Sequence, residues 1–196
     1  MNRILCTVSA VVIGWLSLPQ LAAANSDSRK IDGAHSTITV HVYKSGFLSA
    51  FGHNHEIQAP IQSGAVKESD SPSVELRIDA RKLQVLDPDA SEGSRAQIQD
   101  TMQGNQVLDV GHFPEIRFQS TSVEPKGPDH WIVHGNLALH GRDRPIAFEV
   151  TLKGERYRGS ASLKQTDFGI TPVTVAGGTV RVKNELKIEF EVAFMK

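Results

Sequence analysis

The stretch that decides the fold is residues 180–194, which read VRVKNELKIEFEVAF. Apolar residues take every second position from Val180 to Phe194 except Asn184, and the positions between them are mostly Lys, Arg and Glu. Successive side chains of an extended strand point to opposite faces. This stretch therefore predicts a long β-strand with one apolar face and one charged face.

The same period of two recurs through most of the chain, between turn-forming clusters rich in Gly, Pro and Asp. Apolar faces of so many strands must be buried together, either between two sheets or inside one sheet that curls on itself. About eight strands of this length favour an all-β, antiparallel, strongly coiled β-barrel. The alternating segments are 37–42, 74–79, 131–139, 146–153 and 157–164, and the turn signals include Gly64, 70–72, 126–129, 140–143, 153–155 and 176–178.

One segment breaks the strand pattern. Asp87-Pro88 interrupts the alternation, and residues 91–103 are polar without a period of two. Ser91 or Ser94 can cap a helix that runs to about Met102. We expect one short helix on a long connection.

The amino terminus has the pattern of a secretory signal peptide. Arg3 precedes an apolar run over 4–18, and small residues follow at Ala22 and Ala24. The alternative is a permanent anchor, but the run is shorter than the roughly 20 residues that span a bilayer. We expect a cleaved signal over 1–24, a single barrel domain over 25–196 and a periplasmic location.

The composition of the chain narrows the classes of partner that the protein can have. The chain has 21 Lys and Arg against 22 Asp and Glu, and the signal would remove only Arg3. Such a balance argues against nucleic acid or an anionic membrane surface as a partner. The single cysteine, Cys6, lies inside the expected signal, so the mature domain depends on its core rather than on disulfides.

Several motifs carry a family resemblance, and together they span almost all of the expected mature domain. They are IDGAHS at 31–36, FPEIRFQSTSV at 113–123, VHGNLALHG at 133–141 with Pro145 after it, TDFGI at 166–170 and the closing charged strand. In this order the chain resembles the YceI-like family of exported, lipocalin-like proteins that are associated with polyisoprenoid lipids. It departs from the best-known members at 45–55, SGFLSAFGHNH, where those have a basic or aromatic loop.

The resemblance implies a lipocalin-like barrel that binds an apolar lipid. It implies no reaction and no cofactor, and a homodimer is compatible with it. The apolar side chains that face inward can form either a packed core or the wall of a ligand cavity. The resemblance favours a cavity, in which burial supplies about 25 cal/mol per Å². The expected lumen residues are Phe118, Trp131, Leu137, Phe148, Phe168, Leu186, Ile188 and Phe190.

Several histidines suggest metal binding as an alternative function. On one strand, His53 and His55 would face the same side and could share a metal, with His140, His134 or His112 as a third ligand, in a metal-binding protein or a metal-dependent enzyme. Two spaced histidines without an acidic or cysteine partner are weak evidence, so we interpret His53 and His55 as a polar rim of the barrel. The triplet Asp167-Phe168-Gly169 is found in kinases, but no glycine-rich loop accompanies it.

An outer-membrane barrel also alternates with a period of two. Its apolar residues face outward, between girdles of aromatic residues. This chain has only two Trp and two Tyr, and its polar faces are dense in Lys and Glu. We expect the charged faces to meet water and the mature protein not to be an integral membrane protein.

Overall fold

A computed structural model describes residues 28–45, 54–69, 71–175 and 180–196. The expected signal peptide and His53 lie outside the described residues. In chain order the elements are β1 (Ser28–Lys30), β2 (Thr37–Ser45), β3 (His55–Gln58), β4 (Ile61–Lys67), β5 (Ser73–Asp79), η2 (Ala80–Lys82), β6 (Gln84–Val85), α1 (Glu92–Gln103), β7 (Glu115–Gly127), β8 (His130–Leu139), β9 (Arg142–Lys153), β10 (Arg156–Lys164), η3 (Gln165–Phe168), β11 (Thr174–Val175) and β12 (Val180–Val192).

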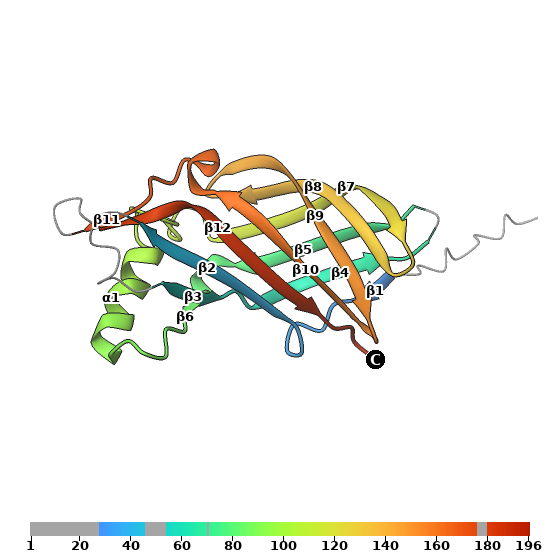
Figure 1. Cartoon of the computed structure of the whole chain (residues 1–196), viewed down its shortest axis with the longest axis horizontal. Helices are drawn as coiled ribbons and strands as arrows, with labels where there is room; N and C mark the ends of the chain where they lie inside the picture. The colour runs from blue at the N-terminus through green and yellow to red at the C-terminus, as the bar shows by residue number, and fades with distance from the viewer. Residues whose placement is uncertain (1–27, 46–53, 70, 176–179) are drawn as a thin grey trace, which may run out of the picture.

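The strands form one antiparallel sheet that curls strongly around an apolar interior (Figure 1). Its order is β1-β4-β5-β7-β8-β9-β10-β12-β2-β3-β6, and β11 pairs with β12. The predicted all-β architecture is confirmed. The described residues contain twelve strands instead of about eight. The difference comes from β1, β3, β6 and β11, which have two to four residues each and are too short to show an alternating pattern.

The chain itself and backbone hydrogen bonds connect the β1–β4 side of the curled sheet to its β12–β2–β3 side. β3 pairs with β2, and after Ala59-Pro60 the chain continues directly into β4, which pairs with β5. Proline suits this bend because it has no N–H that a ladder would have to satisfy. Where these two sides of the sheet meet, Ile31 N–H donates to Gly64 O and Asp32 N–H donates to Ala193 O, both at 2.9 Å. The segment after β1 thereby joins β4 to the chain that follows β12.

The alternation of β12 is confirmed, and its one exception has a structural role. The register of β12 against β2 shifts between Val182 and Leu186, around Asn184. Three residues of β12 lie here opposite the single residue Tyr43 of β2, and an irregularity of this kind bends the strand. The Asn184 Oδ1 accepts a hydrogen bond from Thr166 N–H at 3.0 Å, and its Nδ2 donates to Thr166 Oγ1 at 2.9 Å. The polar residue that interrupts the apolar face therefore fixes η3 against the barrel.

In the described part of the chain the predicted turns lie where the sequence places them, except Gly64, and the turn predicted at 176–178 lies outside the described residues. Gly64 lies inside β4. A Cβ at this position would stand 2.8 Å from both Ile31 Cδ1 and Glu75 O, which is closer than packed atoms come. Glycine here allows close approach of neighbouring strands, and composition alone does not distinguish that use from a turn.

The predicted helix is α1, and the Ser91 side chain caps it by accepting a hydrogen bond from Ser94 N–H. The Gln99 amide fixes the helix to the barrel. Its Oε1 accepts from Val85 N–H at 2.9 Å, and its Nε2 donates to Leu83 O at 2.7 Å. Within the described residues, no helix has the length and apolar character to cross a membrane.

Candidate functional site

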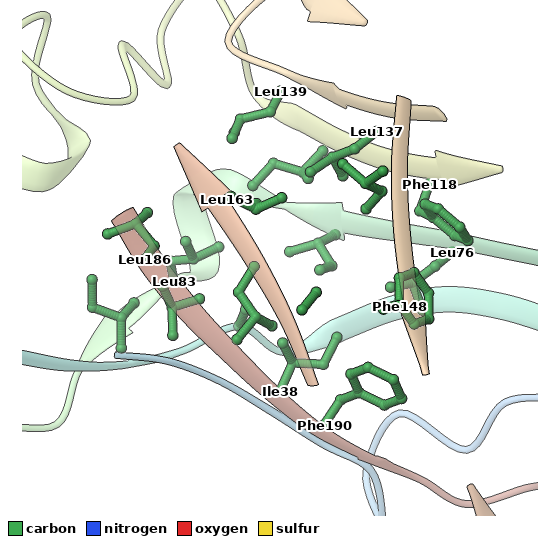
Figure 2. A pocket seen from close by; sticks show the side chains of 18 of the residues that line it. Ile38, Leu76, Leu83, Phe118, Leu137, Leu139, Phe148, Leu163, Leu186 and Phe190 are labelled. Atoms are coloured by element: carbon green, nitrogen blue, oxygen red, sulfur yellow. The ribbon is translucent and has the colours of Figure 1, made fainter. Parts of the chain in front are cut away.

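The interior of the barrel is an apolar cavity of about 930 Å³. Figure 2 shows aliphatic and aromatic side chains from strands on opposite sides of the barrel, together with Leu83, converging on this space. The volume lies near the upper end of the range typical of small-molecule sites. The cavity reaches both ends of the barrel: the helix end, where Ile98 and Met102 of α1 line it, and the turn end, at the β7–β8 turn, where Asp129 lines it.

Exposure along β12 distinguishes a cavity from a packed core. Phe190, Ile188 and Leu186 face inward and line the cavity, yet each keeps an intermediate accessibility, whereas Lys187 and Glu189 between them are exposed on the outer face. In a close-packed interior, inward side chains lose nearly all accessible surface. These residues keep theirs because they face open space inside the barrel.

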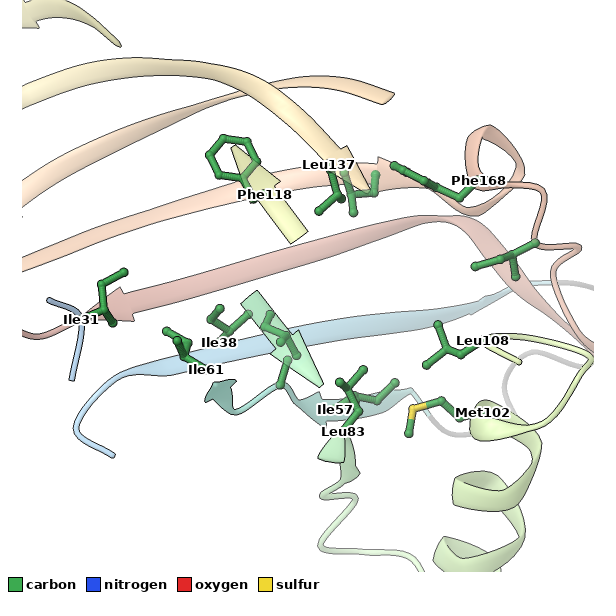
Figure 3. Packing of buried hydrophobic residues seen from close by; sticks show 14 of the residues in the cluster. Ile31, Ile38, Ile57, Ile61, Leu83, Met102, Leu108, Phe118, Leu137 and Phe168 are labelled. Atoms are coloured by element: carbon green, nitrogen blue, oxygen red, sulfur yellow. The ribbon is translucent and has the colours of Figure 1, made fainter. Parts of the chain in front are cut away.

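Seven of the eight expected lumen residues line the cavity; the eighth, Phe168, does not. Phe168 is 1% exposed and packs in the core at the helix end (Figure 3). It belongs to η3, whose 3-10 turn takes it off the alternating parity of β10. The seven are Phe118, Trp131, Leu137, Phe148, Leu186, Ile188 and Phe190.

Other residues of the cavity wall were not among those expected from the sequence, although their positions carry signals for it. Further lining residues, such as Val40 and Leu76, lie on the inward faces of strands that the sequence predicted. The helix contributes Ile98 and Met102, which are spaced i, i+4 and so share one helical face. Which face of a helix meets a barrel depends on the connection, so this contribution needed the structure.

Three aromatic rings form a row along the cavity wall. Phe148 lies 5.3 Å from Phe118 and 5.4 Å from Phe190, measured between ring centroids. Glycines leave room for the outer two rings. A Cβ on Gly135 would stand 2.4 Å from Phe118 Cζ, and one on Gly159 would stand 2.5 Å from Phe190 Cζ. The rings can therefore lie close against the strand backbone.

Polar side chains surround Tyr157 at the turn end. Its hydroxyl donates to Glu68 Oε1 at 3.0 Å, and Arg29 Nη1 donates to the same oxygen at 3.2 Å. The ring meets Trp131 edge-on, with 5.6 Å between centroids. Burial, and then the hydrogen bond to Glu68, raise the pKa of Tyr157 to about 12. Tyr157 is therefore a neutral hydroxyl at physiological pH.

At the helix end, His55 pairs with a buried carboxylate. His55 Nδ1 lies 2.6 Å from Asp87 Oδ2, and Asp87 Oδ1 accepts from Glu56 N–H at 2.9 Å. The Asp87 side chain is 4% exposed and that of His55 is 22% exposed. Arg95 of α1 donates to the Asp87 and Ala90 carbonyls at 3.3 and 2.6 Å. The pair is thus held by the barrel and the helix together.

The residues of the metal alternative take part in separate interactions. His140 Nδ1 lies 3.1 Å from Phe168 O, and its ring meets Phe113 edge-on, whereas His55 contacts Asp87. Across the described part of the chain, no group of three or more His, Cys, Asp or Glu side chains is placed to hold a metal ion. His53 lies outside that part.

A family model, the YceI-like domain, matches residues 30–194. The chain belongs to this family. Curated relatives include UPF0312 proteins of Shewanella. The one from Shewanella sp. strain W3-18-1 is 26% identical over 173 residues, which cover 83% of this chain and 86% of the relative. The one from Shewanella oneidensis is 25% identical over 172 residues, with 83% and 85% covered.

Solved structures of other bacterial proteins share the fold. BcnA of Burkholderia cenocepacia superposes with a TM-score of 0.64 at 18% identity, covering 83% of this chain and 98% of BcnA. A polyisoprenoid-binding domain from Saccharophagus degradans gives 0.57 at 11% identity, covering 85% and 96%. At these identities the likeness establishes the YceI-like barrel and leaves the ligand to be argued from the cavity.

Proposed function

We propose that this YceI-like protein is a periplasmic, non-enzymatic carrier that holds an elongated apolar lipid of the polyisoprenoid class inside its barrel. The observation that carries the proposal is the apolar cavity of about 930 Å³ that reaches both ends of the barrel. The family resemblance supports the lipid class, because a polyisoprenoid-binding domain shares the fold.

The shape of the cavity suits a chain better than a compact ligand. Lining residues extend along β12 from Val180 to Val192. At about 3.3 Å per residue this is roughly 40 Å along the strand, or roughly 30 Å along the barrel axis for a tilt near 40°. A long, narrow molecule fills such a space with the least unoccupied volume.

The chemistry of the wall suits hydrocarbon. Aromatic and branched aliphatic side chains form most of it, and the row Phe118, Phe148 and Phe190 presents ring surface to the interior. Burial of each CH₂ group contributes about 0.8 kcal/mol, against the entropy lost when a flexible chain is ordered. A chain with many buried carbons gains more than this cost, whereas a short one does not.

The test is uptake of a fluorescent polyisoprenoid analogue by the mature protein. Leu186→Trp adds bulk to the cavity wall, and Lys187→Ser is the matched control because Lys187 is exposed on the opposite face of the same strand. We expect wild type and Lys187→Ser to bind equally and Leu186→Trp to lose most uptake while it still unfolds cooperatively. A wild-type protein that takes up no analogue would contradict the proposal.

A further inference from the structure

The wall of the barrel lacks strand pairing along one stretch, between β9 and β10. The hydrogen-bonded ladder of these two strands ends at the pair Glu149 and Ser160. Within the described residues, 145–148 of β9 then pair with β8 alone, and 161–164 of β10 pair with β12 alone. We call these two stretches, which do not pair with each other, the seam.

The side chains of the seam are apolar on the inside and small on the outside. Four of them line the cavity, two from each strand, and Figure 2 shows the β10 ribbon beside Leu163 apart from the β9 ribbon that carries Phe148. Ala147 and Ser162, which continue the register of the ladder on the outer face, are exposed. No ladder of backbone hydrogen bonds has to break when this part of the wall opens, so it opens more easily than a paired part. The four lining residues are Ile146, Phe148, Ala161 and Leu163.

Pro145 indicates that the interruption is built into the sequence. β9 lies between β8 and β10 in the sheet order, and Pro145 is in register with Asn136 of β8. Proline has no N–H for a ladder, and within sheets it occurs where one side of a strand is unpaired. A proline at this position is therefore compatible with pairing on the β8 side alone.

The short helix η3 bridges the seam at the helix end of the barrel. It follows β10 directly in the chain, and side chains from β9 and from the turn before it reach η3. Arg144 Nε donates to Asp167 O at 2.8 Å, and His140 Nδ1 lies 3.1 Å from Phe168 O. The Phe168 ring anchors η3 in the core because it is almost fully buried. These interactions, rather than strand pairing, join β9 to the end of β10.

We propose, resting on the proposed function, that the lipid enters and leaves the barrel sideways through the seam, and that η3 is the latch that holds the seam closed. Opening needs only a displacement of η3 and a separation of β9 from β10, since no ladder joins the two strands there. A hydrocarbon chain that passes between them stays in contact with apolar side chains until it leaves the barrel.

The two ends of the barrel are less suited to the passage of a hydrocarbon chain. At the helix end α1 lines the cavity, and the two hydrogen bonds of Gln99 fix this helix to the barrel. At the turn end a chain would pass Glu68, which is hydrogen-bonded to Arg29 and to the Tyr157 hydroxyl. Either route disturbs polar interactions that the seam does not contain.

The first experiment links the two strands across the seam. The single cysteine, Cys6, lies in the expected signal, so Ala147→Cys with Ser162→Cys gives the mature protein two thiols that a short bis-maleimide can join. Glu149→Cys with Ser160→Cys is the matched control, because this pair lies on the same outer face where the ladder is intact.

Stopped-flow fluorescence measures the rates at which each linked protein takes up and releases the polyisoprenoid analogue. We expect the link across the seam to slow both rates at least about tenfold relative to the linked control. The equilibrium affinity should stay the same, because a higher barrier slows entry and exit equally.

A second pair of variants tests the latch. Arg144→Met keeps the length of the side chain and removes the N–H that donates to Asp167 O. Arg117→Met is its control, because Arg117 is an exposed residue of β7 at a position that pairs with strands on both sides. We expect Arg144→Met to speed release several-fold, in the opposite direction to the link, and Arg117→Met to leave release unchanged.

Failure of this inference differs from failure of the proposed function. Equal rates in the two linked proteins would overturn the lateral route, and unchanged release from Arg144→Met would overturn the latch; either result leaves the lipid carrier standing. A wild-type protein that takes up no analogue would overturn the carrier and the lateral route together.

Discussion

Two phenylalanines in the same barrel should respond differently to truncation, because one packs in the core and the other lines the cavity. Phe168 is 1% exposed, so Phe168→Ala removes a fully buried ring and should cost about 3–5 kcal/mol of unfolding free energy. Phe190 has intermediate accessibility and a ring contact with Phe148. Phe190→Ala loses that aromatic pair, about 0.5–1.5 kcal/mol, and only part of the roughly 1.5–3 kcal/mol of a full side-chain burial. We expect a total loss near 2 kcal/mol.

The assay is urea unfolding of the ligand-free mature protein, followed by titration with the fluorescent analogue. Phe168→Ala should be the less stable variant and should bind the analogue as wild type does once folded. Phe190→Ala should be the more stable variant and should bind with altered affinity, because its wall has changed. Equal losses of stability in the two variants, with equal binding, would refute the distinction between core and cavity wall.

Three further outcomes are expected. The raised pKa of Tyr157, about 12, means that the fold favours the neutral phenol, so this contribution to stability is full below about pH 10 and is lost as the pH rises towards 12; Tyr157→Phe should remove that loss from alkaline unfolding curves. Gly159→Ala should destabilise by about 1–3 kcal/mol because its Cβ meets Phe190 and Glu149 O, whereas Gly93→Ala, with nothing within 4 Å, should gain up to about 1 kcal/mol. Amino-terminal sequencing of protein from an exporting host should begin at or near Asn25, and a retained Met1 would contradict the signal peptide.

The alternating pattern predicted which face of each long strand turns inward, because the period of a strand fixes its faces. It could not predict whether the inward face is packed or hollow. Leu186 and Ile188 would occupy the same parity in both cases, and only the diameter of the curled sheet decides. The prediction that Phe168 faces the lumen was wrong for a related reason. A single 3-10 turn after β10 shifts Phe168 out of the alternating positions of that strand, and no residue in the sequence indicates this turn.

Long-range pairing was beyond the sequence as well. His55 was noticed because of its neighbour His53, yet its partner in the structure is Asp87, 32 residues further along the chain. Asp87 was read only as a breaker of the strand pattern. Between the two residues the chain forms β4 and β5 and returns to the helix end, so their contact depends on the topology of the whole barrel. By contrast, Asn184 did mark its bulge in the sequence, as the one polar residue on the apolar face.

The central claim is that the cavity carries a lipid, and the most direct measurement is mass spectrometry of the protein purified gently from an exporting host. Native spectra should show a bound species at close to one per chain, and organic extraction should release a long apolar lipid with repeated isoprene units. Protein that carries no lipid, and that also takes up no polyisoprenoid analogue after purification, would contradict the account.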